Sequence, residues 1–126
     1  MNALGLRAYR AKKDEFDMTP EERFREHVLA NIETAESQID YSFFGLRELI
    51  ELHGAVSVAK MLVDMNNVLK PYDGFQVLAE HDLEHLSVEQ AIIDFADSDM
   101  FTAAEVQTAK TRLAIHKRRK LRERSE

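Results

Sequence analysis

The sequence predicts an all-α fold, a single-domain helical bundle of four or five helices, and three observations lead to this prediction. The chain has only 4 glycines and 2 prolines in 126 residues, too few for the frequent turns of a β-sandwich. Alanine, leucine, glutamate, lysine and arginine, which favour helices most strongly, make up much of it. Capping boxes at Thr19–Glu22, Ser87–Gln90 and Thr102–Glu105 each precede a stretch with helical spacing.

One long helix is expected over residues 20–53, because an apolar stripe runs through them. The stripe consists of Phe24, Val28, Ile32, Ala35, Ile39, Phe43, Leu46, Ile50 and His53. Steps of three or four residues place all of them on one helix face. Such a helix would be about 50 Å long at ~1.5 Å per residue. Gly45 interrupts it, and Gly54 follows it as a natural stop.

The remaining helices are expected to be shorter. They are predicted at residues 56–69, 75–86, 88–96 and 103–121. A turn at residues 71–74, which contains a proline and a glycine, separates the first two of them. The last of them ends in a dense group of basic residues.

Charge divides the chain into three parts. Residues 1–13 carry a net charge of +4, residues 14–100 carry −15 and residues 101–126 carry +5. We therefore expect a basic N-terminal segment at residues 1–13, followed by a single helical domain over residues 14–126 that ends in a basic helix. Basic ends on an acidic body either bind an external polyanion or pair with acidic surface of the same or a neighbouring copy.

Composition excludes several classes of protein. The chain has no cysteine, which rules out a disulfide scaffold, a thiolate zinc site and a cysteine nucleophile. Its apolar runs fall far short of the ~20 residues that span a bilayer, and residues 1–13 contain no apolar run long enough for a signal peptide. We expect a cytoplasmic protein without a membrane partner.

No catalytic, cofactor or metal site is expected. His81 and His85 would share a helix face, but Asp82 occupies the position where a zinc protease needs glutamate, and no third ligand lies nearby. Paired carboxylates occur at Glu33 and Glu36 and at Glu48 and Glu51. They lack the histidines of a di-iron bundle, so we expect solvated surface charge.

Residues 46–63 are a weak candidate for a helix-turn-helix that meets at Gly54. A DNA-binding version needs a recognition helix with side chains that reach base edges. Here the following segment leads straight to Pro71, and Asp64 would repel phosphate. A corner between two helices inside the bundle is the preferred interpretation.

A cationic run at the end of the last helix is the densest charge cluster in the chain. Its members are Lys117, Arg118, Arg119, Lys120, Arg122 and Arg124. The helix dipole accounts for two or three cations near a C-terminus but not for six. We expect the run to contact an anionic partner, either a nucleic acid or the acidic face of a protein.

The favoured function is a small non-enzymatic helical protein, an adaptor, inhibitor or accessory protein that works by binding another macromolecule. Because a 50 Å helix would outreach a body with a radius of gyration of about 14 Å, we also expect a homo-oligomer. Its seam would be formed by Phe24, Val28, Ile32, Ile39 and Phe43. The alternative is a nucleic-acid-binding regulator that uses residues 117–124 and 46–63, and the third possibility is a small metal-dependent enzyme.

Overall fold

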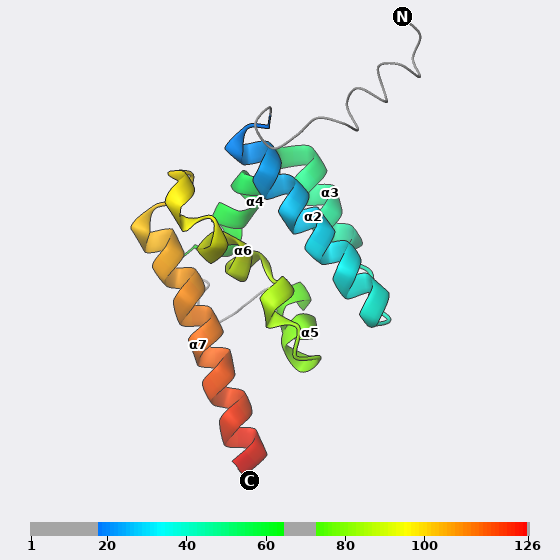
Figure 1. The fold of residues 1–126 in the computed structure, drawn as a ribbon. Helices are drawn as coiled ribbons and strands as arrows, with labels where there is room; N and C mark the ends of the chain where they lie inside the picture. Colours follow the sequence, from blue (N-terminus) through cyan, green and yellow to red (C-terminus); the bar gives the residue numbers. More distant parts are fainter. Residues whose placement is uncertain (1–17, 65–72, 126) are drawn as a thin grey trace, which may run out of the picture.

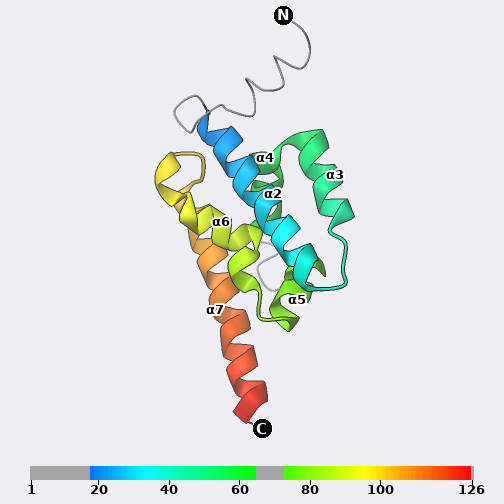
Figure 2. The same ribbon diagram turned by 45° about the vertical axis from the view of Figure 1, so that its right-hand side comes forward.

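The computed structural model describes residues 18–64 and 73–125, which form six α-helices and two short 3₁₀ helices without a strand (Figures 1 and 2). In chain order they are α2 (Pro20–Gln38), α3 (Phe44–His53), α4 (Ala55–Leu62), α5 (Asp73–Glu80), η2 (Glu84–Leu86), α6 (Val88–Asp94), η3 (Ala96–Ser98) and α7 (Ala103–Ser125). The all-α prediction is confirmed, and the expected basic segment at residues 1–13 lies outside the described residues. Within those ranges, no helix has both the length and the apolarity that a bilayer crossing needs.

The predicted long helix over residues 20–53 is wrong, because the chain breaks between α2 and α3. Ile39 adopts an extended backbone, with φ −132° and ψ 152°. The Glu36 carboxylate holds the break: it accepts a hydrogen bond from the backbone N–H of Phe43 at 2.8 Å and pairs with the guanidinium of Arg47. It thereby satisfies the backbone N–H of Phe43, the residue that precedes α3 and makes no side-chain cap of its own.

The break folds the apolar stripe onto one core. In Figure 2, α2 runs down and α3 runs back up, so α3 ends at the end of the molecule where α2 begins. α4 contacts both of them as well as α6. The core includes Phe24, Val28, Ile32, Ala35, Phe43, Ile50, Val58, Ala59, Leu78, Ala91, Ile92 and Ala109. Both halves of the stripe are thus removed from water within a single chain.

Aromatic contacts attach the start of α2 to the other end of the chain. The buried ring of Phe24 meets the rings of Phe95 and Phe101 edge-on, with centroids 5.3 and 5.1 Å apart. Phe95 ends α6, and Phe101 lies just before α7. Edge-to-face pairs of this kind add about 0.5–1.5 kcal/mol to the burial of each ring.

The three predicted helix starts are confirmed. The backbone N–H donates to the capping hydroxyl at 3.1 Å in each pair, from Glu22 to Thr19, from Gln90 to Ser87 and from Glu105 to Thr102. Helix ends differ more from the expectation. α5 stops at Glu80, and Asp82 then adopts the left-handed conformation with φ 60°. α4 stops at Leu62, and residues 65–72 lie outside the described ranges.

A fully buried ion pair joins α6 to α7. The Arg112 guanidinium and the Glu89 carboxylate are both 0% exposed, and Nη1 lies 2.6 Å from Oε2. The same nitrogen donates to the backbone carbonyl of Leu62 at 2.7 Å, at the C-terminal end of α4. Arg112 therefore satisfies a buried acid and a helix-end carbonyl together.

We expect Arg112→Met to lower the free energy of unfolding by about 3–5 kcal/mol, because it leaves the Glu89 carboxylate buried without a cation. Urea denaturation followed by circular dichroism measures this loss. Lys110→Met, at an exposed site on the same helix, is the matched control and should change stability by less than about 0.5 kcal/mol. The double variant Glu89→Leu/Arg112→Met should recover most of the loss. A loss below about 1 kcal/mol in Arg112→Met would contradict this account.

Candidate functional site

The basic end of α7 is the candidate functional site. The first half of this helix packs on α6 and buries Thr108, Ala109 and Arg112. Beyond that packed half, the helix extends past α6 and projects from the body, as the red part of the ribbon in Figures 1 and 2 shows. Side chains on this projecting part have body on one side and solvent on the other.

Two of the six predicted cations face the body. Lys120 Nζ lies 2.7 Å from Asp82 Oδ1 and also pairs with Glu84, while Arg124 Nη2 lies 3.1 Å from the same Asp82 oxygen. The hydrogen bond from Lys120, with the charge of Arg124 as a smaller cause, lowers the pKa of Asp82 below its usual value. These cations therefore dock the projecting helix onto the turn before η2.

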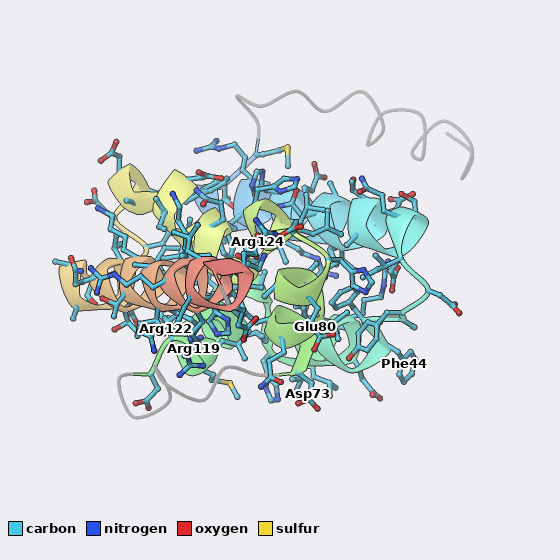
Figure 3. All side chains as sticks on the ribbon, turned by 90° about the horizontal axis from the view of Figure 1, so that it is seen from below. Phe44, Asp73, Glu80, Arg119, Arg122 and Arg124 are labelled. Atoms are coloured by element: carbon cyan, nitrogen blue, oxygen red, sulfur yellow. The ribbon has the colours of Figure 1, made fainter. Side chains whose placement is uncertain are left out.

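Three arginines form what we call the outer face: Arg118, Arg119 and Arg122. All three are exposed, and within the described part of the chain none of them forms an ion pair. Figure 3, which shows the molecule from below, places Arg119 and Arg122 on the opposite side of α7 from Arg124. Lys117 is also exposed and lines a groove of about 360 Å³ beside Lys120. The structure thus divides the predicted run into a paired inner side and an unpaired outer face.

His116 lies on the inner side of α7, one turn before Lys120. Its ring packs edge-on against the ring of Phe75 in α5, with centroids 4.7 Å apart. Burial lowers the pKa of His116, and the charges of Arg119 and Arg112 lower it further. The imidazole is therefore neutral at physiological pH.

The expected oligomer seam is not a surface of this structure. Phe24, Val28, Ile32 and Phe43 are buried in the chain's own core, and Ile39 is partly buried against it. The reason is the break after Gln38, which turns the second half of the stripe back onto the first. The stripe therefore gives no argument for a second copy.

The weak helix-turn-helix candidate also packs into the body. α3 and α4 are joined by Gly54 alone, which has φ 85°. α4 buries Ala55, Val58 and Ala59 between its neighbours, and the Nζ of Lys60 pairs with Glu105 at 2.8 Å. No cation of α4 is left to meet a phosphate. A recognition helix that follows α4 would fall on residues 65–72, outside the described part of the chain.

The metal-binding candidates are separated by the backbone. His81 follows the end of α5, His85 lies in η2, and the left-handed Asp82 stands between them. The two imidazoles are therefore not one turn apart on a common helix, as the sequence had suggested. Glu36 is engaged with Arg47, while Glu33, Glu48 and Glu51 are exposed. Within the described residues, no three acidic or histidine side chains are grouped as metal ligands.

Sequence reasoning missed the acidic partners of the cationic run and one exposed apolar surface. Asp82 and Glu84 lie 36 or more residues before the cations that they bind, and only the fold brings them together. Phe44 and Leu52 are 67% and 69% exposed. Their spacing of eight residues, offset from the main stripe, was the available signal for a second apolar face.

A scan against models of known protein families, a search of curated proteins and a search of solved structures each find no significant match. Function is therefore inferred from the residues of this chain and their contacts.

We expect stability to fall as the pH drops below about 6.5, the ordinary pKa of histidine. The pKa of His116 is lower in the folded chain than in the unfolded chain. As the pH falls from the unfolded-state pKa toward the folded-state pKa, the unfolded chain binds a proton first and is therefore favoured. Urea denaturation across pH 7.5, 6.5 and 5.5 should show a shallower dependence in His116→Gln. His53→Gln, at an exposed site, should keep the dependence of the parent chain. Equal dependences in all three proteins would contradict this assignment.

Proposed function

We propose that this chain is a small non-enzymatic binding protein that holds an acidic segment of another protein on the outer face of α7. The observation that carries the proposal is the division of the cationic run. Lys120 and Arg124 are paired with acids of the body, whereas Arg118, Arg119 and Arg122 are exposed and unpaired in the described chain. We take the cytoplasm as its place of action.

Helix stability alone does not account for the outer face. Arg118 and Arg122 are one turn apart, and like charges at this spacing destabilise a helix by about 0.2–0.5 kcal/mol. The helix dipole favours cations only within the last turn, whereas Arg118 and Arg119 lie further from the end at Ser125. A bound anion would offset this repulsion.

The surroundings of the outer face favour a protein over a nucleic acid. Residues 14–100 carry a net charge of −15. This charge repels the phosphates of a long nucleic acid wherever it extends from the tip of α7 over the body. Ile115, which is half-buried, precedes Arg118, Arg119 and Arg122 by three, four and seven residues and so shares their face. This arrangement fits an acidic amphipathic helix, whose carboxylates would pair with the arginines while one apolar side chain packs against Ile115. A nucleic acid is the second candidate, because six of the nine residues from 116 to 124 are cationic.

We expect Arg118→Gln/Arg122→Gln to weaken binding of a glutamate-rich helical peptide about tenfold, because each exposed charge pair contributes up to about 1 kcal/mol. Fluorescence anisotropy with the labelled peptide measures the Kd. Lys120→Gln/Arg124→Gln is the matched control, since it removes the same charge from the inner side and should change the Kd little.

A short DNA duplex of equal charge tests the second candidate. We expect it to bind more weakly than the peptide at about 50 mM salt and to lose nearly all affinity at about 200 mM. Tighter binding of the duplex would favour the nucleic-acid function. Equal losses in the outer and inner variants would show attraction to overall charge and would remove the support for the outer face.

A further inference from the structure

α3 presents an exposed apolar surface, which we call the α3 face: Phe44, Gly45, Glu48, Leu49 and Leu52. On a helix, residues 44, 48 and 52 follow one another at one-turn intervals, with residues 45 and 49 alongside. Phe44 and Leu52 are more than two-thirds exposed, and Figure 3 shows Phe44 at the margin of the molecule. A Cβ on Gly45 would meet no atom within 4 Å. The face is therefore open between its apolar side chains.

This face is also acidic. Glu48 lies on it, Glu51 lies beside it, and both are exposed. Arg47, the only lysine or arginine in α3, is engaged by Glu36, and its pKa is raised chiefly by that hydrogen bond. Two copies that met through this face would bring like charges together, which opposes association. The fitting occupant is a segment that carries both apolar and cationic side chains.

Residues 1–13 have this composition. They contain Arg7, Arg10, Lys12 and Lys13, no acid, and the apolar residues Leu4, Leu6 and Tyr9. Residues 14–17 connect them to Met18, which lies two residues before α2, and α2 begins at the end of the molecule where α3 ends (Figure 2). The ten residues of α3 span about 15 Å at ~1.5 Å per residue. The seventeen residues before Met18 can reach more than twice that distance at ~3.3 Å per residue.

We propose that residues 1–13 dock on the α3 face of their own chain. Their apolar side chains cover Phe44 and Leu52, and their cations pair with Glu48 and Glu51. The connection to α2 holds the segment at an effective concentration on the order of millimolar, so even a weak contact is formed within one molecule. This proposal does not depend on the partner proposed for α7.

A nitroxide on residue 11 tests the proposal in the full chain. The protein has no cysteine, so Ala11→Cys gives a single labelling site without any background. The measurement is the loss of amide NMR signal caused by the nitroxide. We expect a loss along the whole of α3, as far as Phe44 at the end remote from the start of α2. A loss confined to α2 and the end of α3, or no loss, would overturn the proposal.

Charge reversal identifies the surface that is bound. Glu48→Lys/Glu51→Lys should release the segment and restore the α3 amide signals. Adding Arg7→Glu/Arg10→Glu to this variant should restore the charge complementarity, so that the nitroxide weakens the α3 signals again. Glu26→Lys/Glu33→Lys is the matched control, because it makes the same charge change at exposed sites of α2 and should leave the α3 signals weakened. Equal recovery in both double reversals would mean attraction to overall charge and would overturn the proposal.

Mixed samples separate one chain from two. Nitroxide-labelled protein without isotope is mixed with isotope-labelled protein without nitroxide. We expect no loss of α3 signal in this mixture. A loss there would mean that the segment docks on a second copy, which would overturn docking within one chain.

Discussion

The buried pair of Glu89 and Arg112 sets the position of the helix on which the proposed function rests. Two charges at 0% exposure are costly to remove from water, and only good geometry with further hydrogen bonds offsets that cost. The second contact of Arg112, to the carbonyl of Leu62, brings the end of α4 to the same point. A rotation or shift of α7 would break all of these contacts together. The pair therefore fixes the rotation and register of α7 against the body.

Once this register is fixed, the side chains of α7 that face the body recur in one row at intervals of four residues. Arg112 is succeeded by His116 against Phe75, by Lys120 on Asp82 and Glu84, and by Arg124 on Asp82. Exposure rises along the row, from 0% at Arg112 to 22% at Lys120 and 66% at Arg124. The contacts therefore pass from a buried pair to solvent-screened pairs of small energy. Arg118 and Arg122 lie off this row and are directed to solvent.

Much of the fold could be predicted from local signals, and the errors come from contacts between distant residues. The caps at Thr19, Ser87 and Thr102 involve partners three residues away, so the sequence shows them directly. The break after Gln38 has no glycine or proline to mark it, and the apolar spacing continues across it. What holds it is Glu36, whose partners are seven and eleven residues further along. A straight amphipathic helix and a folded pair of helices share the same periodicity, so periodicity could not distinguish them.

The candidate site, like the fold, could be predicted from the sequence only in part. The cationic run was evident in the sequence, but its sorting into inner and outer members depends on Glu89 and Arg112, which resemble ordinary surface charges in the sequence. Their neighbours give a partial signal. Glu89 follows Val88 and precedes Ala91, and Arg112 lies one turn after the buried Thr108 and Ala109. A charged residue on an apolar helix face needs a partner of opposite charge when it is buried.

The two basic ends of the chain have different relations to the acidic body. At the C-terminal end, Lys120 and Arg124 pair with Asp82 and Glu84, whereas Arg118, Arg119 and Arg122 form no ion pair with the described residues. Toward the other end of the chain, α3 carries exposed apolar side chains, and its exposed Glu48 and Glu51 form no ion pair with the described residues. In the two proposals, charge complementarity is met within the chain at α3 and by a second molecule at α7. One acidic body can in this way hold its own basic segment and still present a basic surface to a partner.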